Sequence, residues 1–192
     1  MNGGEAEDIK IKRISVCFLV CASFLLLLTG CGGVKVSELK EDIDYDFENS
    51  SVGMFTDDLP KDTHTIDVDY TGEIQGVEVG IEKIHFAEGL IGVSLSFNNK
   101  SKDKAYSIAA ATRALRINSK TTLGPKELAY VDYDKSFRKL ENKGDSFTSL
   151  TYWSLEDVDY KNIKEIELQV FIFDDSRSSD KSLINFKRKI SF

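Results

Sequence analysis

The 192-residue chain is short of several residue types on which common kinds of protein site depend. It has three cysteines, two histidines, two prolines and a single tryptophan. His64 and His85 stand apart, and neither has a cysteine or a second histidine at the spacing of metal ligands. The composition is neither collagen-like nor typical of disorder, and it excludes a membrane protein with several spans.

An excess of positive charge is also lacking. The chain has 25 basic and 32 acidic residues, a formal net charge of −7. Non-specific binding to nucleic acid needs a basic face that displaces counterions, so no nucleic-acid partner is expected. The acidity is concentrated in residues 32–62, which carry nine acidic and three basic residues. Residues 63–192 are almost neutral, with 20 acidic and 19 basic residues.

One long apolar run is present, at residues 14–28, directly after Lys10, Lys12 and Arg13. A basic segment followed by an apolar stretch of this length and then by small residues is typical of a secretory signal peptide. The run is shorter than the roughly 20 residues that a membrane-spanning helix needs. We therefore expect residues 1–30 to be a signal peptide that is removed.

The residues around the end of the apolar run indicate a particular class of signal peptide. Leu28, Thr29, Gly30 and Cys31 resemble the lipobox that ends the signal peptide of bacterial lipoproteins. The resemblance implies cleavage before Cys31, a diacylglyceryl group on its thiol, and anchoring at the outer face of the cell membrane. Two acyl chains anchor a protein stably, whereas one chain binds only marginally. The alternative is an uncleaved signal anchor with a coincidental cysteine.

Lysine outnumbers arginine 19 to 6, and together with the lipobox this resembles lipoproteins of low-GC Gram-positive bacteria. Cys17 and Cys21 would leave with the signal peptide, and Cys31 would be lipidated. The mature domain would then have neither a free thiol nor a disulfide, and only its core would stabilise it.

Residues 31–62 are predicted to form the lipidated cysteine and a flexible acidic tether. High charge and scattered apolar residues do not offset the entropy lost on ordering. Fully stretched, such a segment reaches about 100 Å. The tether is therefore expected to lift the domain off the bilayer and into the cell wall.

Residues 63–192 show the alternation of apolar and polar residues that is typical of strands. The clearest case is residues 91–97, and a change of phase between Ile81 and Ile84 predicts a β-bulge. Residues 108–115 contain good helix formers, but a strand is favoured there. About seven or eight short strands with polar turns between them predict an all-β sandwich.

Three groups of residues resemble the immunoglobulin-like domains of small Gram-positive lipoproteins, most of which have no assigned function. They are a strand that ends at Phe97 and continues into residues 98–101, a turn at residues 155–157 before residues 163–166, and a strand end at residues 171–175. The resemblance implies an immunoglobulin-like β-sandwich and no particular activity.

One stretch spaces its oxygen-bearing side chains like a calcium-binding loop. Asp67, Asp69, Thr71 and Glu78 fall at ligand positions of an EF-hand, but β-like residues stand on both sides where helices should be. The alternative interpretation is two strands with exposed carboxylates. No metal site is therefore assigned, and calcium binding remains a weak alternative.

No sequence motif for catalysis is present. Gly92-Val93-Ser94-Leu95-Ser96 lacks the second glycine of a nucleophile elbow, and no phosphate-binding loop or dinucleotide fingerprint occurs. His85 is expected to face solvent from a strand, without an acidic partner. No catalytic residue and no cofactor are therefore assigned, although dispersed carboxylates could still meet in space.

Two further groups are candidates for binding. Tyr152 and Trp153 are adjacent in a predicted strand, so one should enter the core while the other forms an exposed platform for a sugar or peptide. Residues 187–189 form a basic patch that is interpreted as protection of an edge strand, or as a contact to a wall polymer.

The sequence favours a lipid-anchored extracytoplasmic binding or scaffolding module, without catalysis, that contacts a protein, a peptide or a cell-wall polymer. The alternatives are an accessory subunit or hydrolase-like enzyme of the envelope that uses dispersed carboxylates and, more weakly, a calcium-binding envelope protein.

Overall fold

The computed structural model describes residues 33–47, 51, 56, 58–132, 135, 137–155, 159–175 and 182–192. The chain divides into two compact units, Met1–Gly33 and Val34–Phe192, and the second contains all the described strands. The lipobox, Cys31 and the apolar run at 14–28 lie outside the described residues, as does most of the predicted turn at 155–157. No helix in the described part of the chain has the length and apolar character of a membrane span.

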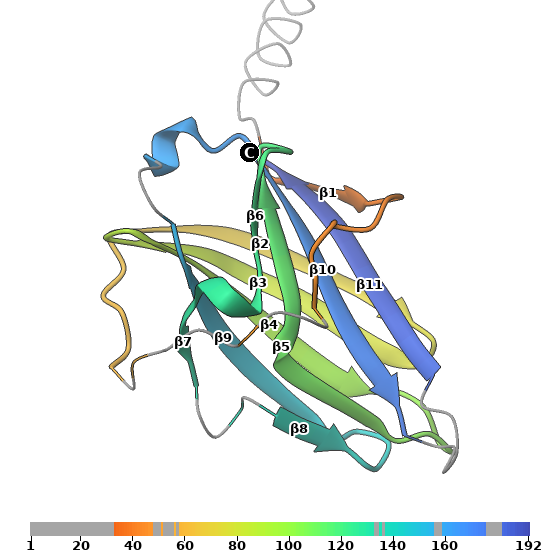
Figure 1. The fold of residues 1–192 in the computed structure, drawn as a ribbon. Coiled ribbons are helices and arrows are strands. Elements are labelled where there is room, and N and C mark those ends of the chain that lie inside the picture. The colour runs from red at the N-terminus through yellow and green to blue at the C-terminus, as the bar shows by residue number, and fades with distance from the viewer. Residues whose placement is uncertain are drawn as a thin grey trace, which may run out of the picture. The chain divides into compact units, whose positions relative to one another are not determined.

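The second unit is an all-β sandwich, as predicted (Figure 1). All pairings between named strands are antiparallel. The six-stranded sheet has the order β1 (Lys35–Glu38), β11 (Ser182–Ser191), β10 (Glu165–Asp174), β5 (Tyr106–Ile117) and β6 (Thr121–Leu123), and β8 (Phe137–Leu140) also pairs with β5. The five-stranded sheet has the order β2 (His64–Ile74), β3 (Val77–Ala87), β4 (Leu90–Asn99), β9 (Ser146–Ser154) and β7 (Leu128–Val131).

The long strands agree with the sequence pattern. Residues 91–97 lie in β4, and residues 108–115 lie in β5 as favoured. The predicted bulge is confirmed, because the register between β3 and β4 shifts between Ile81 and Lys83. The eleven strands of the described residues exceed the seven or eight expected. The additional strands have three or four residues, too few for an alternating pattern to be recognised.

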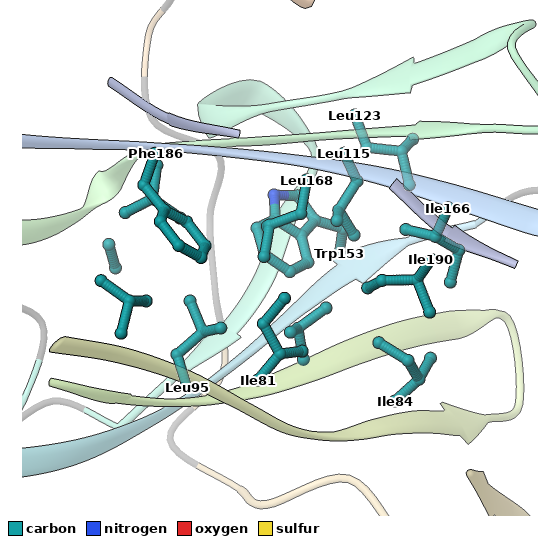
Figure 2. Close-up of a cluster of buried hydrophobic side chains, with 14 of the residues drawn as sticks. Ile81, Ile84, Leu95, Leu115, Leu123, Trp153, Ile166, Leu168, Phe186 and Ile190 are labelled. Atoms are coloured by element: carbon teal, nitrogen blue, oxygen red, sulfur yellow. The ribbon is translucent and has the colours of Figure 1, made fainter. Parts of the chain in front are cut away.

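The core lies between the two sheets (Figure 2). Ile81, Ile84 and Leu95 from the five-stranded sheet face side chains of the six-stranded sheet, among them Leu168 and Phe186, and all five are fully buried. Burying one such side chain contributes about 1.5–3 kcal/mol relative to exposure. Apolar burial between the two sheets is therefore a main contribution to the stability of this unit.

The core also contains a guanidinium group. Arg113 of β5 is fully buried and donates from Nη1 to Ser149 Oγ at 3.0 Å and to Thr151 Oγ1 at 2.7 Å. Its guanidinium lies 5.5 Å from the centre of the Phe97 ring. Burial lowers the pKa of Arg113 to about 10. The described residues give this group no carboxylate partner, so hydroxyl groups and an aromatic face are what hold it.

The structure differs from the predicted flexible tether at residues 34–47. Strand β1 pairs with β11, and the strap (residues 39–47) then packs on the outer face of the six-stranded sheet. Leu39 and Ile43 of the strap are buried with Ala114, and the Ile43 N–H donates to Gln169 Oε1 at 2.6 Å. The folded unit thus begins at Val34 and not at Thr63.

The second half of the strap is held by its aromatic residues. The Phe47 ring lies 5.0 Å from the Phe171 ring, edge to face. Tyr45 accepts a hydrogen bond from the Lys126 N–H at 3.0 Å, and its ring lies over Gly124. A Cβ atom at Gly124 would stand 2.4 Å from that ring, so the residue must lack a side chain.

The basic residues 187–189 do not lie on an edge strand, so that interpretation is wrong. Strand β1 covers the outer edge of β11. Lys187 pairs with Asp42 at 2.9 Å and Lys189 pairs with Glu165 at 2.7 Å. The Arg188 guanidinium stacks over the Phe186 ring at 4.4 Å. Each of the three therefore has a partner within the fold.

Candidate functional site

The outer face of the five-stranded sheet carries a cluster of polar side chains that the local strand geometry brings together. Strands β3 and β4 form a hairpin whose turn contains Gly89 in the left-handed conformation, with φ of 66°. The hairpin pairs His85 with Gly92 and Lys83 with Ser94. The residues between them, such as Ile84 and Val93, are buried in the core. His85 and Ser94 therefore project from the opposite, outer face.

His85 connects two oxygen-bearing side chains. Its Nδ1 lies 2.8 Å from Asp62 Oδ2, and its Nε2 lies 2.7 Å from Ser94 Oγ. Because a carboxylate only accepts hydrogen bonds, Nδ1 is the donor in the contact with Asp62. In the tautomer whose single ring hydrogen is on Nδ1, Nε2 accepts a hydrogen bond from the Ser94 hydroxyl.

The environment of His85 differs from the prediction. The residue is only 8% exposed, whereas the sequence pattern indicated a solvent-facing side chain without an acidic partner. That prediction is wrong because Asp62 and Tyr152 lie beside the ring. Asp62 lies in the segment that the sequence predicts to be a tether, and that segment has no strand pattern that would indicate a contact with the sheet.

Tyr152 holds the other oxygen of the same carboxylate. Its hydroxyl donates to Asp62 Oδ1 at 2.5 Å. Burial raises the pKa of Tyr152, and the hydrogen bond to Asp62 raises it further. The Tyr152 ring lies over Gly92, where a Cβ atom would stand 2.6 Å from it, and the Tyr130 ring meets it edge-on at 5.9 Å. We call Asp62, His85, Ser94 and Tyr152 the outer-face network.

The predicted aromatic platform is not present. Tyr152 and Trp153 do point to opposite faces of β9, but the exposed fraction is 1% for Tyr152 and 0% for Trp153. Trp153 lies in the core, as one of the two was expected to do (Figure 2). Tyr152 is covered on the outer face because its ring packs against Gly92 and its hydroxyl reaches Asp62. Neither ring offers a free face for stacking.

In the outer-face network a hydroxyl, an imidazole and a carboxylate follow one another in the order used for nucleophilic catalysis. Such chemistry also needs hydrogen-bond donors for the oxyanion. Ser94 stands in β4, which pairs with β3 on one side and with β9 on the other. The backbone N–H groups beside Ser94 therefore bond within the sheet and do not serve as donors to an oxyanion. The ammonium of Lys83, directly opposite Ser94, pairs with Asp67 at 2.9 Å.

The proposed calcium ligands do not come together. Asp67, Asp69 and Thr71 lie along β2, and Glu78 lies on β3 beyond the connecting turn. Opposite Asp67 on β3 stands Lys83, five residues along the strand from Glu78. The extended hairpin separates the carboxylates that a calcium loop would gather. No group of three or more possible metal ligands occurs among the residues described.

A cavity of about 330 Å³ lies near the β3–β4 turn, and no residue of the outer-face network lines it. Its described lining residues are Thr63, Phe86, Ala87, Glu88, Gly89, Leu90, Leu155, Asp159 and Tyr160. The ring of Tyr160, one of the lining residues, stacks on the His64 ring with 5.0 Å between their centres. The cavity and the outer-face network are therefore separate features of the same sheet.

Comparison with known proteins gives little further information. No protein-family model matches the sequence, and no curated protein sequence matches it either. Among solved structures, the chain is similar to the yjhA protein from Bacillus subtilis, with 10% sequence identity and a TM-score of 0.39. That match covers 53% of this chain and 76% of the other. The function must therefore be argued from the residues themselves.

Proposed function

We propose that the chain is a lipid-anchored extracytoplasmic binding module that contacts a protein, a peptide or a cell-wall polymer through the outer face of its five-stranded sheet. The lipobox residues Leu28, Thr29 and Gly30 before Cys31 support the anchor and its location at the outer face of the cell membrane. The resemblance to immunoglobulin-like lipoprotein domains remains a prediction from sequence.

One observation carries the choice of face. The strap covers part of the outer face of the six-stranded sheet with apolar side chains, whereas the five-stranded sheet carries the outer-face network. Ser94 and Ser96 of β4 are partly exposed, and Thr148 of β9 is exposed. Hydroxyl groups on a regular strand surface suit a partner that itself offers hydroxyl or amide groups.

The binding face is tested by affinity capture from the envelope of the producing cell with a matched pair of variants. Thr148→Arg places a bulky charge on the outer face of the five-stranded sheet, and Thr121→Arg makes the same change on β6 of the other sheet. We expect the captured partner to be lost with Thr148→Arg and retained with Thr121→Arg. Retention of the partner by both variants contradicts the assignment of the face.

The anchor is tested separately by labelling cells with a fatty-acid analogue. The proposal requires label on the wild-type chain and none on Cys31→Ala. Label that persists in Cys31→Ala would show attachment at another residue and would refute Cys31 as the anchor.

The order of hydroxyl, imidazole and carboxylate in the outer-face network favours a second candidate function, acyl transfer from an ester with Ser94 as the nucleophile, in which the oxyanion would need a donor other than the neighbouring backbone N–H groups. In this scheme Ser94 Oγ attacks the carbonyl carbon while His85 Nε2 takes the hydroxyl proton. His85 then returns that proton to the leaving alcohol, and water hydrolyses the acyl-serine. This differs from the predicted use of dispersed carboxylates, because the acid here orients a histidine.

A fluorophosphonate probe with mass-spectrometric mapping tests this candidate. We expect phosphonylation at Ser94, lost in Ser94→Ala and in His85→Ala. Ser96→Ala is the matched control, since Ser96 lies two residues along the same strand on the same face and has no described histidine contact. An unlabelled wild-type chain, or label at other serines only, excludes serine-nucleophile chemistry here.

A further inference from the structure

The folded unit begins very close to the residue that the lipobox marks for lipidation. Strand β1 starts at Lys35, four residues after Cys31. Four residues span at most about 14 Å when fully extended. The predicted tether of 31 residues would have allowed about 100 Å. An anchor at Cys31 therefore keeps the start of β1 close to the bilayer surface.

The contacts around Lys35 define which end of the sandwich this is. Lys35 pairs with Ser191, near the end of β11, and Ser191 pairs with Glu165, at the start of β10. The turn after β5 reaches the same place, because the Asn118 N–H donates to the Glu165 carbonyl at 3.0 Å. The segment before β10 joins it, since the Lys164 N–H donates to Asn118 Oδ1 at 2.8 Å.

Four exposed lysines gather at this end, which we call the anchor end: Lys35, Lys120, Lys161 and Lys164. Lys120 belongs to the turn after β5, and Lys161 lies in the short 3₁₀ helix Tyr160–Asn162, whose last carbonyl accepts from Asn118 Nδ2 at 3.0 Å. None of the four forms an ion pair with another described residue. The Lys161 ammonium lies 5.9 Å from the centre of the Tyr160 ring, and none of the four ammonium groups is neutralised by a described carboxylate.

The described acidic residues nearby offset only part of this charge, because Glu88 and Asp159 are the two that form no ion pair with a described residue. Glu165 is neutralised by Lys189 at 2.7 Å. Asp159 accepts the Lys161 N–H at 3.0 Å as the cap of the 3₁₀ helix, and it lines the cavity near the β3–β4 turn together with Glu88. Among the described residues, lysines thus exceed unpaired carboxylates at the anchor end.

We propose that the anchor end rests on the anionic headgroups of the bilayer that holds Cys31, through Lys35, Lys120, Lys161 and Lys164. The proposal rests on the proposed lipid anchor and adds an orientation to it. The short connection brings the end within reach, and basic side chains next to a membrane attachment are attracted to anionic lipid. The outer-face network then stands beside the bilayer on an upright sheet, and not at the end of a long tether.

The orientation is tested on the chain that begins at Cys31, whose residues Val34–Phe192 form a compact unit of their own. Because Cys31 is the only cysteine of this chain, its thiol can be coupled to a maleimide lipid. The coupled protein is placed on vesicles of phosphatidylglycerol and phosphatidylcholine in equal amounts. Lysine acylation by an activated ester is then mapped by mass spectrometry, with uncoupled protein as reference.

The opposite end of the sandwich supplies internal controls. Lys102 and Lys143 are exposed there. Two backbone hydrogen bonds mark this end: the Lys100 N–H donates to the Gly76 carbonyl at 2.8 Å, and the Gly144 N–H donates to the Asn99 carbonyl at 2.7 Å. Strands of ten residues place that end about 33 Å from the anchor end. Lys102 and Lys143 should therefore react at the same rate on vesicles and in solution.

We expect the four lysines of the anchor end to react at least about threefold more slowly on anionic vesicles than in solution. Salt at 0.5 M shortens the screening length to about 4 Å, so we expect it to relieve this protection. Unchanged rates at the four lysines, or protection of Lys102 and Lys143, overturn the orientation. Equal protection on pure phosphatidylcholine overturns the contact with anionic headgroups. Because the coupling is chemical, these outcomes are independent of whether cells lipidate Cys31.

Discussion

The segment that precedes β2 contacts the two sheets by two different kinds of interaction. On the six-stranded sheet the strap buries Leu39 and Ile43, while on the five-stranded sheet Asp62 forms hydrogen bonds to His85 and Tyr152. Apolar burial contributes in proportion to the area removed from water and tolerates small shifts. Hydrogen bonds contribute less in net free energy, but they fix one geometry and are costly when only one partner remains.

This difference predicts a division of roles. The strap should account for most of the stability that the segment provides, and Asp62 should determine how the outer-face network is arranged. Substitutions that remove one kind of contact without the other can therefore separate the two.

The largest effect is expected from Ile43→Ala in the strap. Ile43 is 3% exposed, and truncating a buried isoleucine to alanine costs about 2–5 kcal/mol. Because the strap can shift to fill part of the space, we expect the free energy of unfolding to fall by about 2–3 kcal/mol. Urea unfolding measures it, with Leu59→Ala as the control because Leu59 is 62% exposed. Similar losses for both variants would mean that the strap does not contribute by burial.

Asp62→Ala should have the next largest effect. The change leaves His85 Nδ1 and the Tyr152 hydroxyl without their acceptor, and an unsatisfied buried polar group costs about 1–3 kcal/mol. We expect urea unfolding to show a loss in this range and the NMR signals of the His85 ring to shift. Asp58→Ala, at an exposed position of the same segment, is the control and should change neither. An unchanged His85 spectrum in Asp62→Ala would mean that the carboxylate does not hold the ring.

The sandwich could be predicted from sequence because its long strands are buried on one face. In β4, Ile91, Val93, Leu95 and Phe97 alternate with small or polar residues, and all four are buried. The strap could not be predicted in this way. Its apolar residues follow neither the period of a strand nor that of a helix. Each packs separately on the outer face of the six-stranded sheet, and the sequence of the strap contains no information about the position of that face.

Two of the four residues of the outer-face network, His85 and Ser94, could be predicted from the sequence to lie side by side. A two-residue turn between β3 and β4 pairs His85 with Gly92, and this places Ser94 beside the histidine on the same face. The position of Asp62 could not be predicted, because the segment that contains it shows no periodic pattern of apolar residues. Arg113 shows the same limit, since a charged residue in a strand indicates an outer face and here it enters the core.

Tyr152→Phe removes one of the two hydrogen bonds to Asp62 and keeps the ring over Gly92. A single hydrogen bond contributes about 0.5–1.5 kcal/mol, so we expect a loss of stability in that range at neutral pH. The loss should be smaller than that of Asp62→Ala, because the His85 contact remains. A loss equal to or larger than that of Asp62→Ala would place the main contribution at the tyrosine hydroxyl.

The same variant predicts a change in the pH dependence of stability. Burial and the hydrogen bond to Asp62 raise the pKa of Tyr152 in the folded state, whereas an unfolded tyrosine titrates near pH 10. Above about pH 10 the unfolded chain therefore binds fewer protons than the folded chain, and stability falls as the pH rises. Wild type should lose more stability than Tyr152→Phe between pH 9 and pH 11. Parallel curves for the two proteins would contradict a raised pKa.

The smallest effect is expected from Asp42→Asn, at the polar rim of the strap. Asp42 Oδ1 lies 2.9 Å from Lys187 Nζ, and the hydrogen bond from Lys187 lowers the pKa of Asp42. The Asp42 side chain is 67% exposed, so water and salt screen the pair. Exposed ion pairs contribute about 0–1 kcal/mol, and we expect at most about 0.5 kcal/mol here, vanishing in 1 M salt. A loss comparable to that of Ile43→Ala would mean that charge, and not apolar burial, holds the strap on the sheet.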